Sequence, residues 1–322
     1  MAVLTTFGAS LAAVYFGSTY TISIITEIAV LVIFALSIDI LVGYTGLVTF
    51  GHAGFMGVGA YTCAYLSHHL AWPVGTAILG GILAGILTGF VVGFLVIRVT
   101  GVFFIMVTLA MSMMFYSWAF KARMFGADDG LTGLKRLDLA GIGIDLNDPR
   151  AFSLLCLALA FLTFILIGVL ARSPFGQILR AIKQNENRIR AQGCPVRAYK
   201  LAAFVISAAF ASLAGILQLQ NTLFLHPNVA FWYKSGEGLI TVIIGGAGTL
   251  VGAILGTYFF VLLHRAVEAY TQFWQVWVGV AIILLLLVAP EGIHGGLRSV
   301  WLWRPGLRAR LARQPISAKD DD

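Results

Sequence analysis

The stretch GYTGLVTFGHAGFMGVGAY, from Gly43 to Tyr61, holds six glycines and one histidine between two long apolar runs. A glycine inside a helix costs about 1 kcal/mol relative to alanine. Two arrangements explain so many of them. Either the small residues let neighbouring helices pack closely, or the helix is interrupted at membrane depth, where irregular backbone persists only against protein or a water-filled route. Transporters place such interruptions along their substrate route.

The composition is that of a membrane protein. Of 322 residues, 59% are hydrophobic and 11% are charged, and the mean hydropathy is +0.92. A soluble domain carries about 25% charged residues. We expect an all-α polytopic membrane protein with about 8–10 transmembrane helices, some interrupted, because a spanning helix needs about 20 apolar residues. The apolar runs are 22–42, 52–69, 73–97, 99–120, 151–171, 200–220, 236–247, 250–266 and 273–290, with a shorter run at 3–16.

The charges predict which loops face the cytoplasm. Residues 172–200 carry seven Lys or Arg against Glu186 alone, and the tail after residue 297 is also basic, whereas 121–150 balances five basic residues with five Asp. Basic loops stay in the cytoplasm. We therefore predict a transmembrane permease domain over 1–297, with an external loop at 121–150 and a cytoplasmic loop at 172–200, followed by a cytoplasmic tail at 298–322.

The same rule constrains the region from Lys200 to Arg298, which has to cross the membrane an even number of times if both ends are cytoplasmic. The long apolar run from 236 to 266 must then turn back on itself. Its middle, IIGGAGTLVG at Ile243–Gly252, supplies glycines for a turn. We predict two segments that meet there. The two glycine-rich stretches lie in opposite halves of the chain and hint at an internal repeat, and paired interrupted segments point to a transporter site.

A few ionisable and polar residues interrupt the apolar runs. Such residues are functional candidates by default, although Asp39 could equally lock two helices together. Arg265 and Glu268 are three residues apart, which favours a local ion pair. The candidates for the translocation pathway are Asp39, Gly43, Thr45, Gly46, His52, Gly245, Gly246 and Gly248.

Enzyme signatures are absent from the sequence. It contains no GxSxG nucleophile elbow, no HExxH zinc motif and no GxxxxGK[ST] phosphate-binding loop. We therefore expect no catalytic residue, no metal site and no cofactor in this chain. The excess of positive charge sets topology rather than binding nucleic acid.

The loop at 172–200 predicts an amphipathic helix. Apolar residues recur at near-helical spacing from Phe175 to Ile189, Ser173-Pro174 provides a start, and Gly193 provides a stop. Such a helix either lies on anionic lipid or docks in a groove of a soluble partner.

Several motifs in this chain resemble those of one family. ENRIRAQGCPVRAYKLAAFVIS at Glu186–Ser207 is similar to the coupling loop of permeases of branched-chain amino acid ABC importers, specifically the LivM-type subunit. It keeps Glu186, Ala191 and Gly193 of a degenerate EAA---G element but has Asn187-Arg188 after the glutamate. ILVGYTGLVTFGHAGFMGVGAYT, GADDGLTGL, VIIGGAGTLVGAILG and APEGIHGGL resemble further motifs of that subunit, with Ala253 where proline is usual.

The resemblance implies a permease of the type II ABC importer kind in the bacterial inner membrane, with its C-terminus cytoplasmic. It implies a second permease of the LivH type, two cytoplasmic ATPases that bind ATP and Mg, and an extracytoplasmic substrate-binding protein. Glu186, Arg188, Ala191 and Gly193 would couple the chain to the ATPases. The substrates implied are branched-chain or other hydrophobic amino acids, with urea or short amides as the alternative. An ATP-independent channel or secondary carrier remains the rival class.

Overall fold

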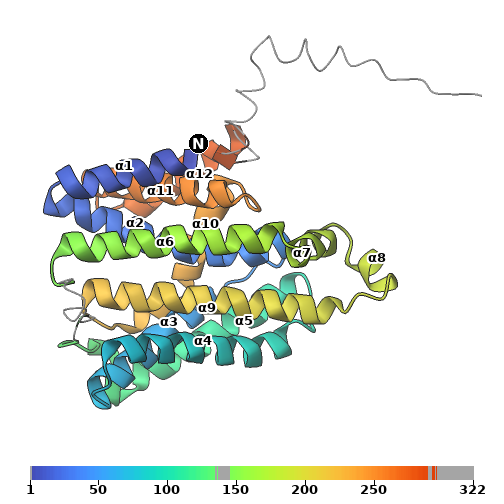
Figure 1. Ribbon diagram of the computed structural model, residues 1–322, viewed down its shortest axis with the longest axis horizontal. Coiled ribbons are helices and arrows are strands. Elements are labelled where there is room, and N and C mark those ends of the chain that lie inside the picture. The colour runs from blue at the N-terminus through green and yellow to red at the C-terminus, as the bar shows by residue number, and fades with distance from the viewer. Residues whose placement is uncertain (1, 135, 137–145, 289–291, 294, 296–322) are drawn as a thin grey trace, which may run out of the picture.

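The computed structural model describes residues 2–134, 136, 146–288, 292–293 and 295, which form a bundle of helices lying side by side (Figure 1). The tail at 298–322 and the domain boundary before it lie outside the described residues. In the described part there is no strand, only a single β-bridge between Leu131 and Leu225. The all-α expectation is confirmed.

The helices of the bundle follow the apolar runs of the sequence. They are α1 (Ala2–Phe16), α2 (Thr19–Asp39), α3 (His52–Ala64), α4 (Val74–Val96), α5 (Val102–Lys121), α6 (Pro149–Arg172), α9 (Val196–Thr222), α10 (Trp232–Gly245), α11 (Leu250–Glu268) and α12 (Trp274–Val288). Within the described residues, six helices are long and apolar enough to span a membrane, namely α2 with its extension, α4, α5, α6, α9 and α11. Of the shorter helices, α3 and α10 pack among them, α12 lies against α10 and α11, and α1 lies at the outer edge of the bundle (Figure 1).

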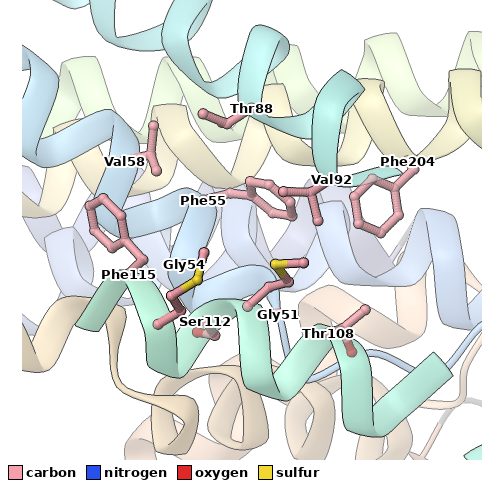
Figure 2. Close-up of a pocket in the computed structure, with 12 residues that line it drawn as sticks. Gly51, Gly54, Phe55, Val58, Thr88, Val92, Thr108, Ser112, Phe115 and Phe204 are labelled. Atoms are coloured by element: carbon pink, nitrogen blue, oxygen red, sulfur yellow. The ribbon is translucent and has the colours of Figure 1, made fainter. Parts of the chain in front are cut away.

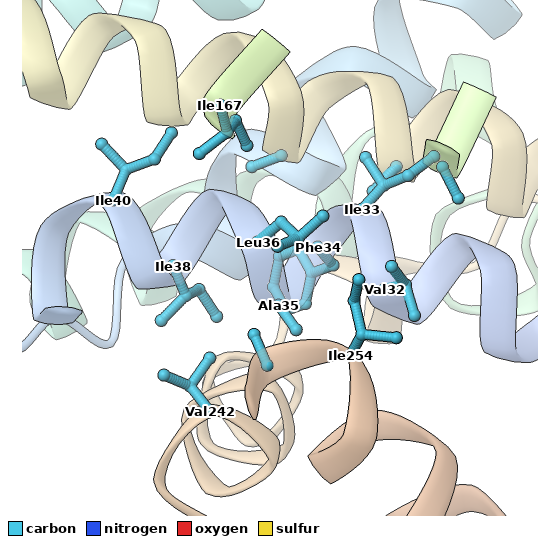
Figure 3. Close-up of a cluster of buried hydrophobic side chains, with 14 of the residues drawn as sticks. Val32, Ile33, Phe34, Ala35, Leu36, Ile38, Ile40, Ile167, Val242 and Ile254 are labelled. Atoms are coloured by element: carbon cyan, nitrogen blue, oxygen red, sulfur yellow. The ribbon is translucent and has the colours of Figure 1, made fainter. Parts of the chain in front are cut away.

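Helix α2 is the centre of the bundle. Its most hydrophobic window is 83% buried inside the protein, whereas those of α4 and α5 are 22% buried. Ile33, Leu36 and Ile38 of α2 gather with Val242 of α10 and Ile254 of α11 in one apolar cluster (Figure 3). A polar group in the second half of α2 is therefore surrounded by protein.

Glycines on α4 serve close packing. Gly81, Gly85, Gly89 and Gly93 recur every four residues on its buried face. A Cβ at Gly85 would overlap Ser212 of α9, and Cβ atoms at the other three positions would crowd α9 in the same way. This small-residue stripe lets two helix backbones approach closely.

The glycine-rich stretch at 43–61 contains both arrangements that the sequence left open. Gly54, Gly57 and Gly59 lie within α3 and pack against α5, the segment before α10, and α9. The interruption occurs before them. Helix α2 continues as a π-helix over Ile40–Thr45, and an irregular segment at 46–51 then leads to α3.

The predicted turn in the long apolar run is confirmed. Helices α10 and α11 form an antiparallel hairpin whose turn is 246–249. Cβ atoms at Gly245 and Gly256 would overlap backbone of the opposite helix, at Gly252 and Thr241 respectively. The glycines therefore allow the two arms to touch along their length.

The amphipathic segment after α6 is two helices rather than the single one expected. Helix α7 (Pro174–Gln184) is capped by Ser173, and α8 (Glu186–Ala191) begins after Asn185. Asn185 is extended, with φ −158° and ψ 95°, and its side chain accepts from Arg188 N at 3.0 Å. The prediction was wrong here because asparagine competes with the helical backbone and caps a new helix. Both helices lie at one end of the bundle, the α7 end (Figure 1).

Candidate functional site

The candidate site is the junction where α7 meets the interrupted end of α2 and the α10–α11 turn. Lys183 of α7 donates from Nζ to the Gly43 carbonyl oxygen at 2.8 Å. One turn earlier, the Arg180 guanidinium lies 5.0 Å from the centre of the Tyr44 ring. Two cationic side chains thus attach α7 to the π-helical segment of α2.

The two glycine-rich stretches meet at the same place. The Gly248 N–H donates to Oδ1 of Asp39 at 2.7 Å. A Cβ at Gly43 would overlap both the Asp39 carboxylate and the backbone of Gly248. The two interruptions are therefore in direct backbone contact, and only glycine at position 43 leaves room for it.

Left-handed backbone marks both sides of the junction. The φ angles are +74° at Gly46, +108° at Gly246 and +86° at Gly248. L-residues with a Cβ seldom adopt such angles, so these turns favour glycine.

Asp39 is fully buried and acts as a tie between segments. Its Oδ1 accepts from the turn, and its Oδ2 has no hydrogen-bond partner among the described residues. Lys183 supplies a positive charge near this carboxylate. A buried carboxylate is tolerated when it is hydrogen-bonded and accompanied by a cation. The structure thus gives Asp39 a helix-joining contact, the alternative weighed from the sequence, within the junction itself.

The remaining pathway candidates lie beside or away from this contact. Thr45 donates to Leu41 O at 2.6 Å within its own segment, and Gly245 lies in the hairpin interface. His52 is elsewhere. Its Nε2 lies 2.6 Å from Ser207 Oγ, which donates to the Ser37 carbonyl oxygen. His52 therefore ties α3 to α9 and α2.

The candidates for coupling lie on and after α8. Glu186 pairs with Arg190 and with Lys200, each at 2.6 Å. The Lys200 side chain is only 5% exposed, so this pair fixes α8 against the start of α9. Arg188, Ala191 and Gly193 are exposed, and Gly193 has φ +83°.

The sequence reasoning missed the contacts that α7 makes with α2. Lys183 follows the buried Leu179 by four residues, which places it at the edge of the buried face of α7, where the residue is exposed overall but its Nζ reaches Gly43. A lysine beside the buried face of an amphipathic helix indicates that its ammonium group has a hydrogen-bond acceptor within the protein. Its partner could not be identified, because Gly43 is 140 residues earlier in the chain.

A second charged group lies toward the opposite end of α2. The predicted pair between Arg265 and Glu268 is present at 3.1 Å. Arg265 also pairs with Glu27 of α2 at 2.5 Å, a partner that the sequence did not indicate. Arg265 thus joins α11 to α2 as well as to its own last turn.

An apolar cavity of about 170 Å³ lies among α3, α4, α5 and α9 (Figure 2). Its polar lining consists of Thr88, Thr108 and Ser112, and no charged side chain reaches it. The Ser112 hydroxyl is already used, because it donates to the Ala230 carbonyl oxygen at 3.0 Å. The cavity suits an apolar group. In the described part of the chain, no three His, Cys, Asp or Glu side chains converge as a metal site would require.

Comparisons with protein families and with known proteins agree on one family for this chain. Residues 20–289 match the model of the permease component of branched-chain amino acid transport systems. The chain is 28% identical over 295 residues to the high-affinity branched-chain amino acid transport system permease protein LivM of Escherichia coli, covering 85% of this chain and 69% of that protein.

Other relatives, which align with less than half of this chain, are permeases that carry other names. LivH of the same Escherichia coli transport system is 28% identical over 42% of this chain and 44% of its own length. The autoinducer 2 import system permease protein LsrC of an Enterobacter species is 28% identical over 44% of each chain. No solved structure matches.

Proposed function

Because the chain belongs to the family of permease components of branched-chain amino acid transport systems, we propose that it forms half of the translocation pathway of an ATP-driven importer. Its substrates are branched-chain or other hydrophobic amino acids. The transport mechanism is alternating access, in which the pathway opens to one side of the membrane at a time. The chain itself hydrolyses nothing.

The observation that carries this proposal is the Lys183–Gly43 contact. It connects the amphipathic α7 to a π-helical segment, and through Gly43 to the α10–α11 turn. A displacement of α7 would act on two interrupted membrane segments at once. Packed segments of this kind have discrete arrangements rather than a continuum, which suits a pathway that opens and closes.

The partners in this proposal are those of an ABC importer. They are a second permease of the LivH type, two cytoplasmic ATPases that bind ATP and Mg, and an extracytoplasmic binding protein. The exposed Arg188, Ala191 and Gly193 on and after α8 would face an ATPase. Glu186 would hold α8 in place through its two ion pairs.

Hydrophobic amino acids are the preferred substrates because the relatives that cover most of this chain are LivM proteins. The apolar cavity beside α3 agrees with apolar cargo. Urea or short amides are the alternative within the family. An ATP-independent channel or carrier is the alternative class, and it gives no account of a basic helix attached to the interrupted segments.

The first test is Lys183→Met in the reconstituted importer. Methionine keeps an unbranched apolar stem but removes the hydrogen bond to Gly43. Hydrogen bonds to charged groups contribute about 1.5–3 kcal/mol, so we expect transport per ATP hydrolysed to fall roughly tenfold or more. ATPase subunits should still copurify. Lys121→Met, at the exposed end of α5, is the matched control and should transport normally.

The composition of the purified complex distinguishes an ATP-driven importer from an ATP-independent channel or carrier. Affinity purification from the native membrane in mild detergent, followed by mass spectrometry, should recover a second permease and ATPases. Transport in liposomes by the purified chain alone, without ATP, would instead establish the carrier or channel class. The substrate-binding protein encoded in the same operon as the copurifying subunits can then be titrated with candidate ligands by calorimetry. Its preferred ligand would distinguish amino acids from urea and amides.

A further inference from the structure

A cavity of about 410 Å³ opens at the α7 end of the bundle, between α6, α7, the π-helical end of α2 and the start of α11. Its charged lining is Arg172 at the end of α6 and Arg180 on α7. No carboxylate lines it, and neither arginine forms an ion pair with a described carboxylate. The lining therefore carries two arginines without an ion-pair partner among the described residues, and the nearest carboxylate there, Asp39, lies behind Gly248 and Tyr44 and is accompanied by Lys183.

Arg180 is held in place for an incoming anion. Its Nη2 donates to the Ala171 carbonyl oxygen at 3.3 Å, and its guanidinium lies over the Tyr44 ring. These contacts use part of the guanidinium, and a planar group with five donors retains others for an anion. The first turn of α11 borders the same cavity, and the Thr249 side chain does not cap it. Such a helix start adds favourable potential for an anion.

The other wall of the cavity is apolar and continues along the outside of α6. Phe164, Ile165 and Val169 line it. Ile165 and Val169 are 43% and 65% exposed, on a face of α6 that also presents Leu162 and Leu166 to the surroundings. Positive charge at the end of a spanning helix, directly beside an exposed apolar face, matches a phosphate headgroup attached to acyl chains.

We propose that this cavity binds an anionic phospholipid, with its phosphate between Arg172 and Arg180 and an acyl chain along α6. Basic pockets between transmembrane helices at the cytoplasmic face bind acidic lipid headgroups. The positive-inside rule predicts that the α7 end lies on that side. Because Arg180 and Tyr44 belong to the junction described above, a bound lipid would steady α7 against α2.

The experiment uses the intact importer complex in detergent, titrated with phosphatidylglycerol or phosphatidylcholine and analysed by native mass spectrometry. We expect phosphatidylglycerol to bind more tightly than phosphatidylcholine. The double variant Arg172→Ala/Arg180→Ala should weaken phosphatidylglycerol binding by about 30-fold, since each basic side chain contributes roughly fivefold at an anionic surface. The matched control is Arg98→Ala, because Arg98 is also exposed and stacks on an aromatic ring, Phe94, at 4.7 Å.

A charge-preserving variant keeps the test decisive if the double alanine variant fails to fold. Arg172→Lys/Arg180→Lys should retain phosphatidylglycerol binding within about tenfold, because lysine also binds phosphate as a point charge. Equal affinities for both lipids, or unchanged binding in the double alanine variant, would overturn the proposal. Displacement of phosphatidylglycerol by millimolar inorganic phosphate would show a site for a free anion instead. The importer's amino acid transport does not enter these readouts, so the proposal stands or falls separately from the proposed function.

Discussion

At the scale of single residues, Asp39 and Gly43 depend on each other. Buried Asp39 is tolerated at the end of α2 because a backbone N–H of the α10–α11 turn donates to its Oδ1 and Lys183 supplies a positive charge nearby. That turn reaches Asp39 only because position 43 has no side chain. The sequence singled out both residues as functional candidates, but it placed neither beside the turn at Gly248.

Gly43→Ala tests this dependence. The added methyl overlaps Asp39 and Gly248, so we expect a loss of about 1–3 kcal/mol in stability, typical of overpacking, together with reduced transport. Thermal unfolding of the purified complex and uptake in liposomes measure the two effects. Gly168→Ala on α6 is the control, because its methyl would lie 3.7 Å from the nearest atom, Leu250 Cδ1, an ordinary contact. Normal transport by Gly43→Ala would contradict the close approach.

At the scale of elements, the bundle uses glycine in two physically different ways. On α4 the glycines form a regular stripe within an unbroken helix, and they bring α4 against α9. At Gly46, Gly246 and Gly248 they permit left-handed backbone where helices stop. The close-packing role of the α4 glycines can be predicted from their spacing of four residues. The role of the glycines at the helix ends becomes visible only when their backbone φ angles are known.

Gly85→Val tests the stripe on α4. The valine side chain would collide with Ser212, so α4 and α9 must separate, and we expect destabilisation of about 1–3 kcal/mol. Gly279→Val on α12 is the matched control. Beyond its chain neighbours and the backbone of its own helix, no described atom lies within 4 Å of a Cβ at Gly279, so the change there should stay within about 0.5 kcal/mol. Equal melting temperatures for the two variants would show that the stripe does not determine packing.

The division of the amphipathic segment into α7 and α8 separates two sets of contacts. Helix α7 carries Lys183 and Arg180, which contact α2. The short α8 presents the residues that resemble the family's coupling element, with Arg188 exposed. A force on α8 would therefore reach the membrane segments through α7 and the Asn185 bend.

At the scale of the whole molecule, the junction links the bundle's end to its centre, because α2 is the most buried spanning helix. Alternating access requires relative movement of packed elements. If α7 moves against the interrupted end of α2, a covalent link between them should stop transport.

The double variant Gly46→Cys/Lys183→Cys provides that link. A Cβ at Gly46 would lie 3.8 Å from the Lys183 Cβ, a separation that a disulfide bridges readily. In a Cys194→Ser background, the reduced double variant sets the baseline uptake, which already includes the loss of the Lys183–Gly43 hydrogen bond and the strain of a side chain at the φ of +74° of Gly46. Oxidation should reduce uptake to a small fraction of that baseline, and dithiothreitol should restore the baseline. Each single variant controls for oxidation elsewhere. Unchanged uptake after complete cross-linking would mean that this contact is static during transport.

The sequence by itself determined the apolar helical segments, the hairpin turn within Ile243–Gly252 and the family motifs, but not the break between α7 and α8. These follow from local properties: apolar length, periodicity and the backbone freedom of glycine. The hairpin in particular followed from charge counting, because two basic regions on one side demand an even number of crossings.

Only the tertiary structure decided which candidates belong together. It brought Asp39, Gly43 and Gly248 into one junction with Lys183, and it placed His52 in a separate tie with Ser207. Glu27 likewise found Arg265 across 238 positions. Such pairings could not be predicted from a single sequence, because burial shows that a polar group needs a partner while the packing of distant helices selects which one.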